Sequence, residues 1–187
     1  MNIIRKKKFT LGLVGSSQVE QFLLEYLEDQ DIDPIMLSSS PKKARNIVYS
    51  GRLDDIIHNT IEQHPDLDGV FIFVGVNDVK QNSEVREIAS NILEIAERFE
   101  DIGIPPLIMP LVNRDNPSGI LVPKYRKIKN SVNRLIRRYY QSNYKKYNVI
   151  NIENLELKPD GVHLTRRSYR TISRAIKIQM NFLTSSN

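Results

Sequence analysis

Cysteine and tryptophan are both absent from this sequence of 187 residues. Without cysteine, the chain can form no disulfide bond and no metal site built on thiolates. The sequence also lacks an apolar run long enough to span a membrane. Its first apolar segment, residues 3–14, is too short and too interrupted by charge to serve as a signal peptide. These absences together favour a cytoplasmic location.

Acidic residues are scarce in the second part of the chain. Residues 116–187 contain 15 Lys and Arg but only 3 Asp and Glu, whereas residues 1–115 contain 12 and 19. A surface of this charge can contact nucleic acid or an anionic lipid, and the tyrosines placed among lysines at residues 140–147 are weakly typical of nucleic-acid binding. The same charges can instead form the solvated outer face of a helix whose tyrosines pack into the core. The sequence alone leaves both interpretations open.

The remaining composition is that of an ordinary globular protein. Apolar residues make up 40% of the chain and charged residues 26%. The length suits one domain, residues 1–187, built around one hydrophobic core. No internal repeat and no low-complexity linker divides the chain.

Apolar runs and helical patterns alternate along the sequence. The runs predict strands at residues 8–15, 34–38, 69–74, 104–110 and 149–152. Apolar residues at helical spacing predict helices at residues 19–27, 53–61, 85–99, 125–139 and 169–180. Alternation of this kind predicts an α/β protein in three layers, with a five-stranded parallel sheet between two layers of helices.

The carboxyl ends of parallel strands meet at one edge of a sheet, and four polar positions fall there. Ser17 follows Gly15 at the end of the first strand. It can cap the next helix, or its hydroxyl can act as a nucleophile beside the N–H groups at the start of that helix. Gly51, just before the second helix, is either a turn glycine or a residue whose N–H approaches a ligand because no side chain blocks it.

The other two positions follow the third and fifth strands. Asn77 and Asp78 can bind a ligand or cap a helix. Within residues 159–164, a proline and a glycine predict a tight turn that can bring Asp160 within hydrogen-bonding reach of His163. The carboxylate would then hold one ring nitrogen and leave the other to take a proton from a nucleophile. The alternative is that Asp160 caps the last helix and His163 is an exposed loop residue.

The types and order of these residues resemble the SGNH, or GDSL-type, hydrolase family. The matching pattern is Ser after Gly, a lone Gly before the second helix, Gly-x-Asn-Asp after the central strand and Asp-x-x-His before the last helix. The resemblance covers essentially the whole chain and implies that family's flavodoxin-like fold. Gly75 and Asp78 then look like scaffold residues. One block departs from the family, because Gly-Asp-Ser is replaced by residues 15–17, Gly-Ser-Ser, which removes a supporting carboxylate.

The resemblance also implies a role for each matching residue. Ser17 would be the nucleophile, His163 the general base and Asp160 the carboxylate that orients the base. The oxyanion would be bound by the N–H groups of Ser17 and Gly51 and by the side-chain amide of Asn77. This chemistry requires no metal ion and no cofactor.

Two functions fit these expectations. The first is a serine ester hydrolase, a carboxylesterase or acetylesterase, that acts on a small acyl ester, an acetylated sugar or a lipid. Loops 38–50 and 112–123 contain no long apolar stretch, which favours a short acyl group. The second is a catalytically weak binding module on the same fold, whose basic region 116–187 contacts nucleic acid or anionic lipid.

Overall fold

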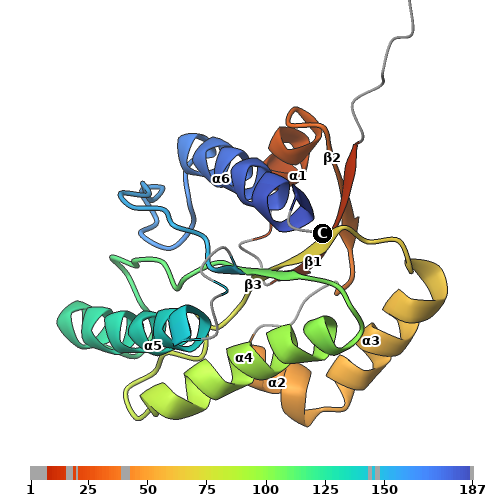
Figure 1. Ribbon diagram of the computed structural model, residues 1–187. Coiled ribbons are helices and arrows are strands. Elements are labelled where there is room, and N and C mark those ends of the chain that lie inside the picture. The colour runs from red at the N-terminus through yellow and green to blue at the C-terminus, as the bar shows by residue number, and fades with distance from the viewer. Residues whose placement is uncertain are drawn as a thin grey trace, which may run out of the picture.

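The structure is a computed structural model that describes residues 8–15, 19, 21–38, 43–142, 145 and 148–185 (Figure 1). Its strands are β1 (Phe9–Gly15), β2 (Ile32–Met36), β3 (Gly69–Phe73) and β4 (Pro106–Ile108). Its helices are α1 (Gln21–Glu28), α2 (Ala44–Tyr49), α3 (Arg52–Gln63), α4 (Val85–Asp101), α5 (Val122–Ser142) and α6 (Arg166–Ser185).

The sheet lies between two layers of helices. Its strands are all parallel and stand in the order β2-β1-β3-β4. Figure 1 shows α1 and α6 on one face of the sheet and α2 to α5 on the other. The central strand β3 is buried along its whole length, because it has neighbours on both edges and helices on both faces. The α/β class and the three layers predicted from the sequence are therefore present.

Helix α4 illustrates why the helices pack as they do. Its buried residues recur at helical spacing and include Ile88, Ile92, Ile95 and Phe99. This spacing places them on one stripe, which covers the sheet while the charged side chains face outward. Burial of each such side chain contributes roughly 2 kcal/mol, so a helix with one apolar stripe is stable only against the sheet.

The predicted fifth strand, residues 149–152, is not a strand among the described residues. It is reduced to one parallel bridge between Val149 and Ile108, with Ile150 N–H donating to Ile108 O at 2.9 Å. In a parallel ladder the next N–H would come from residue 110, which is proline and has none. The described sheet therefore has four strands, and the chain after Ile150 leaves the edge of the sheet.

Helix α2 was not predicted from the sequence. It lies in the polar connection after β2, and only Ala44 and Ile47 are buried in it. Two apolar residues are too few to give a visible helical period. The start of this helix is instead fixed by a contact with a distant carboxylate, Asp78, which a local pattern does not reveal.

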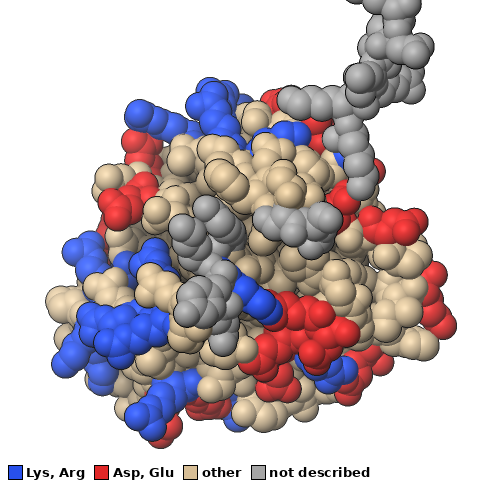
Figure 2. All heavy atoms as spheres, in the orientation of Figure 1, with Lys and Arg blue, Asp and Glu red and all other residues tan. Residues whose placement is uncertain are grey.

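The charge asymmetry of the sequence is also an asymmetry of the surface. Figure 2 shows Lys and Arg gathered on the side of the molecule where α5 lies, and Asp and Glu grouped over α3 and α4. In the described parts of the chain, no helix combines the length and the apolar character that a membrane crossing requires.

Candidate active site

The side chains of Asp160 and His163 are joined, as the sequence predicts. Asp160 Oδ2 lies 2.7 Å from His163 Nδ1. Because a carboxylate only accepts, the neutral ring carries its proton on Nδ1 and leaves Nε2 as an acceptor. Within the described part of the chain, Nε2 has no hydrogen-bond partner. The His163 side chain is 34% exposed, so the ring lies at the surface of the described structure.

A tight turn sets this geometry. Gly161 N–H donates to Lys158 O at 2.9 Å, and Gly161 has a φ of 66°, in the left-handed region that favours glycine. Pro159 occupies the second position of the turn, where its fixed φ is preferred. Asp160 Oδ1 then accepts from Val162 N–H at 2.8 Å and from His163 N–H at 2.9 Å. The carboxylate is oriented by two backbone bonds as well as by the ring.

We expect Asp160 to stay ionised in acid. The His163 N–H, the His163 ring and the Val162 N–H all hold the pKa of this carboxyl well below its usual range. Since the folded pKa is the lower one, the stability that these bonds give is present above about pH 4 and is lost only as the pH falls toward the folded value. Carbon NMR of the carboxyl should show a midpoint below 3.8 in the native protein.

The variant His163→Ala removes the ring bond and keeps the two backbone donors, so the midpoint of Asp160 should move upward by part of the shift. A native midpoint at or above 3.8 would contradict the described contacts.

The loop after β4 supports the Asp160 turn. The N–H groups of Asp115 and Asn116 both donate to Gly161 O, at 2.9 and 3.2 Å. A Cβ atom on Gly161 would lie 3.0 Å from Asn116 N, so the approach of the two chains depends on the missing side chain. The loop that follows β4 and the loop that carries the acid–base pair are thus held together.

Asn77 follows β3 and lies within a turn closed by a 3.0 Å bond from Asp78 N–H to Gly75 O. Asn77 Oδ1 accepts a hydrogen bond of 2.9 Å from Arg114 Nη2. A guanidinium group has only donors, so this contact requires the amide to turn its oxygen toward Arg114. The Nδ2 donors of Asn77 therefore face away from Arg114.

Arg114 is a buried cation with no carboxylate partner in the described chain. The residue is 7% exposed, and its Nε has no hydrogen-bond partner among the described residues. Burial lowers the pKa of its guanidinium, while the nearby Tyr125 acts in the opposite direction. The Tyr125 hydroxyl donates to Val112 O at 2.9 Å, and burial raises the pKa of Tyr125 to about 12. The segment around Arg114 is therefore also fixed from α5.

Sequence reasoning missed Arg114. Its contact with Asn77 joins residues 37 positions apart. The spacing of apolar residues along the chain does not reveal a contact between such distant positions. The one signal present is that Arg114 is the lone cation between Arg98 and Lys124 and falls after a predicted strand.

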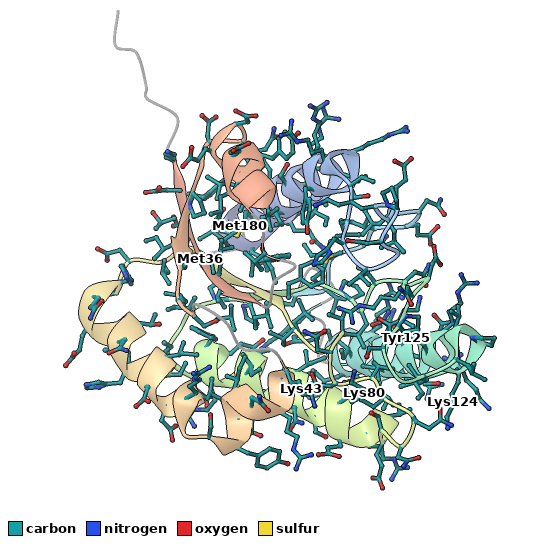
Figure 3. All side chains as sticks on the ribbon, turned by 180° about the vertical axis from the view of Figure 1, so that it is seen from behind. Met36, Lys43, Lys80, Lys124, Tyr125 and Met180 are labelled. Carbon is teal, nitrogen blue, oxygen red and sulfur yellow. The ribbon has the colours of Figure 1, made fainter. Side chains whose placement is uncertain are left out.

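Asp78 serves the scaffold rather than a ligand. Its Oδ2 accepts from Ala44 N–H at 2.8 Å and its Oδ1 from Arg45 N–H at 3.2 Å, at the start of α2. Burial raises the pKa of Asp78, and these two donors oppose that shift. Asp78 also lines a hollow of about 340 Å³ together with Lys43 and Lys80. These two lysines are labelled in Figure 3, which shows the molecule from behind. The scaffold role implied by the resemblance agrees with these bonds.

Gly51 is not brought to this group by any described contact. It lies between α2 and α3 with a φ of 73°, and, its two chain neighbours aside, no heavy atom of the described residues lies within 4 Å of where a Cβ would be. The start of α2 binds Asp78, and Gly51 lies beyond the opposite end of that helix, about 9 Å of rise away. The structure therefore supports the turn-glycine interpretation, and an oxyanion role for Gly51 stays a prediction.

Replacing Gly51 by alanine separates these two interpretations. The left-handed backbone should reduce the free energy of unfolding by about 1 kcal/mol, and kcat/KM for ester hydrolysis should stay within about twofold. Gly103→Ala is a matched control, because Gly103 has a φ of 80° and equally open surroundings at the end of α4. A fall in kcat of about 100-fold in Gly51→Ala alone would instead place its N–H at the oxyanion.

Ser17, the predicted nucleophile, and Ser16 lie outside the described residues. Gly15, at the end of β1, is in register with Phe73 of β3. The chain therefore leaves β1 at the same edge of the sheet from which β3 leads to Asn77. Among the described residues, no three His, Asp or Glu side chains group as metal ligands.

Comparison with solved structures finds this fold in several hydrolases. A lipase/acylhydrolase from Enterococcus faecalis aligns with 15% identity and a TM-score of 0.66, over 93% of this chain and 96% of that one. A GDSL-like lipase from Bacteroides thetaiotaomicron aligns with 16% identity and a TM-score of 0.68, over 94% and 88%. A psychrotrophic esterase from Pseudoalteromonas sp. aligns with 16% identity and a TM-score of 0.65, over 94% and 98%. No family model and no curated protein matches the sequence.

Proposed function

Because this chain has the fold of the SGNH hydrolases, we propose that it is a serine ester hydrolase, a carboxylesterase or acetylesterase. The observation that carries this proposal is the bond between Asp160 and His163, which orients the ring and leaves Nε2 open. The bonds from Asp115 and Asn116 to Gly161 support it, because they tie this pair to the loop that carries Arg114.

In the first half of the reaction, Ser17 attacks the ester carbonyl. Its hydroxyl proton passes to His163 Nε2, and the imidazolium is stabilised by the ionised Asp160. The negative charge on the former carbonyl oxygen is met by Asn77 Nδ2 and by the Ser17 N–H. His163 then gives its proton to the leaving alcohol, and the acyl group stays on Ser17.

In the second half, water takes the place of the alcohol. His163 removes a proton from the water, the hydroxide attacks the acyl carbonyl, and the same donors bind the oxyanion. The proton returns to Ser17 as the carboxylic acid leaves. Arg114 acts as a positioning residue in both halves, because it holds the Asn77 amide in the orientation that donates.

A covalent probe tests the proposal. The protein should hydrolyse 4-nitrophenyl acetate, and a fluorophosphonate should modify one serine, which peptide mass mapping should identify as Ser17. The variant Ser16→Ala should still be labelled and Ser17→Ala should not. Labelling of another residue would move the nucleophile elsewhere, and absence of both hydrolysis and labelling would refute the esterase assignment.

The alternative function is a binding module whose basic region 116–187 contacts nucleic acid or anionic lipid. The gathering of Lys and Arg beside α5 favours it (Figure 2). A single-stranded oligonucleotide or an anionic vesicle should then bind with an affinity that falls steeply with salt and is the same in Ser17→Ala. Binding that does not respond to salt would count against this function.

A further inference from the structure

A hollow of about 690 Å³ lies beside α5, within the size range of small-molecule sites. One wall is α5 from Lys129 to Gln141. The other walls are residues 109–113, which follow β4, and residues 152–155, where the chain has left the sheet. The hollow is therefore part of the same sheet edge as the candidate active site.

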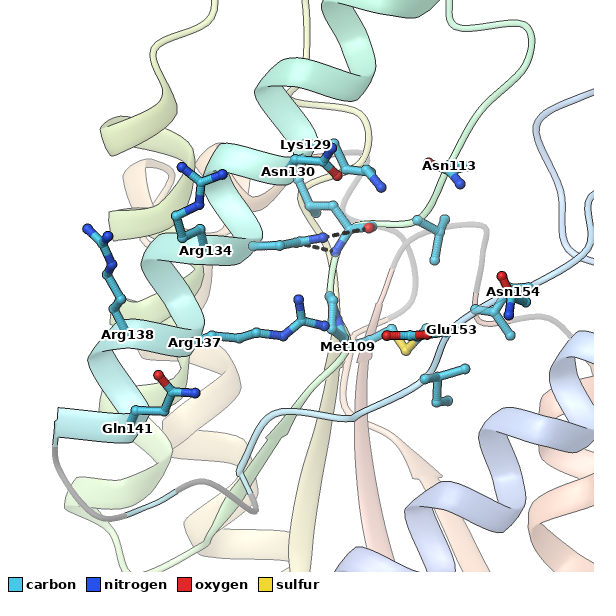
Figure 4. A pocket seen from close by; sticks show the side chains of 16 residues that line it. Met109, Asn113, Lys129, Asn130, Arg134, Arg137, Arg138, Gln141, Glu153 and Asn154 are labelled. Atoms are coloured by element: carbon cyan, nitrogen blue, oxygen red, sulfur yellow. Dashed lines mark hydrogen bonds between the residues drawn. The ribbon is translucent and has the colours of Figure 1, made fainter.

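The cations that line this hollow have no carboxylate partner within the described residues. They are Lys129, Arg134, Arg137 and Arg138. Figure 4 shows Lys129 and Arg137 extending from α5 across the hollow, and Arg134 and Arg138 pointing outward from it. Glu153 is the acidic residue of the lining and lies on the opposite wall, with no ion pair to either inward cation.

Asn133 fixes the distance between the helix and the opposite wall. Its Oδ1 accepts from Leu111 N–H at 2.8 Å, and its Nδ2 donates to Leu111 O at 2.9 Å, the two bonds dashed in Figure 4. Lys129 and Arg137 stand four residues before and after Asn133, so they share its face of α5. The two bonds between Asn133 and Leu111 thus form a buried clamp, and one of the two cations lies on each side of this clamp.

Lys129 lies in surroundings that disfavour its charge. Burial is the largest cause that lowers the pKa of Lys129, and the positive charges of Arg126 and Arg137 lower this pKa further. Arg126 is paired with Asp115 at 3.1 Å, whereas Lys129 and Arg137 have no such partner in the described chain. An anion that binds in the hollow beside these two cations offsets the repulsion between them.

Both walls opposite α5 are connected to the acid–base loop, one through hydrogen bonds and the other along the chain. Asn113 lines the hollow, and two residues later Asp115 donates to Gly161 O, so at most about 7 Å of chain separates them. Leu155 also lines the hollow, and the next residue, Glu156, accepts from Thr165 N–H at 3.0 Å. A ligand in the hollow is therefore a neighbour of the loop that holds His163.

We propose that Lys129 and Arg137 bind an anionic group of the substrate, so that the esters cleaved by this protein carry a phosphate, sulfate, sulfonate or carboxylate group. The proposal rests on the esterase function for its substrate role, and on the hollow itself for anion binding. The volume has room for a sugar-sized body beside the anion.

Two measurements test this site. The first is calorimetric binding of inorganic pyrophosphate at low salt, to the native protein and to the variant Lys129→Gln/Arg137→Gln. We expect the variant to bind about tenfold or more weakly, because two charged contacts are lost. Arg174→Gln is the matched control, since Arg174 is an exposed arginine of α6 outside the hollow, and its affinity should stay within about twofold.

The second measurement compares kcat/KM for 4-acetoxybenzenesulfonate with that for 4-nitrophenyl acetate. The ratio should fall about tenfold in the double variant and should not change in Arg174→Gln. Equal pyrophosphate affinity in the native protein and the double variant would overturn the site. Lost binding with an unchanged ratio would overturn its substrate role. If neither ester is cleaved but binding is still lost in the variant, the esterase function fails and the anion site stands.

Discussion

The variant His163→Ala should lose about 10⁴- to 10⁶-fold in kcat/KM for 4-nitrophenyl acetate. The loss follows from the geometry, because Nε2 is the acceptor that the turn leaves open and no other described imidazole lies in this loop. In the proposed mechanism, the Ser17 proton would then have no acceptor and the leaving alcohol no donor. Initial rates over a range of substrate concentrations measure the effect.

His58→Ala is the matched control for this prediction. His58 is an exposed residue of α3, and its Nε2 pairs with Glu62 at 3.3 Å. Exposed pairs of this kind contribute little to stability, so activity and melting temperature should both stay near the native values. If His163→Ala kept more than about a tenth of native activity while folded, the assignment of His163 as general base would be wrong.

The variant Asn77→Ala should lose about 100- to 1,000-fold in kcat, with a much smaller change in KM. In the proposed mechanism, the amide contacts the carbonyl oxygen only when this becomes an oxyanion, so removal of the amide should raise the barrier by about 3 kcal/mol and hardly affect ground-state binding. Arg114→Met should lose about 10- to 100-fold in kcat, because the freed amide can turn its oxygen toward the substrate.

A double-mutant cycle separates this positioning role from a general loss of structure. If Arg114 acts through Asn77, the double variant Asn77→Ala/Arg114→Met should be as active as Asn77→Ala alone. Methionine keeps most of the side-chain length and removes a buried charge that has no carboxylate partner in the described chain, so unfolding should not become easier. Multiplicative losses in the cycle would show that Arg114 acts independently of the amide.

The sequence was sufficient for the features that depend on local patterns. Alternating strands and helices predicted the layers, and Pro159 and Gly161 predicted the turn that joins Asp160 to His163. In both cases the controlling interactions lie within a few residues or follow from the period of apolar side chains.

The features that the sequence did not reveal depend on contacts between distant segments. Arg114 reaches Asn77 across 37 positions, and Asp78 fixes the start of α2 across 34. The role of Gly51 could not be decided from the sequence for the same reason, since a glycine before a helix has the same local pattern whether it faces a ligand or solvent, and its oxyanion role stays a prediction. Lys129 and Arg137 were visible as charges, but the clamp between Asn133 and Leu111 that places them was not.

Pro110 has an effect beyond the ladder that it ends. Had it an N–H, the chain after Ile150 could continue along β4 and lie flat against it. Instead that chain leaves the sheet, and Pro110 lines the hollow between residues 152–155 and α5. Pro110 thus prevents a fifth strand at this edge and leaves room for the hollow. The variant Pro110→Val restores the missing N–H donor and tests whether the chain after Ile150 can then pair with this segment and fill the hollow.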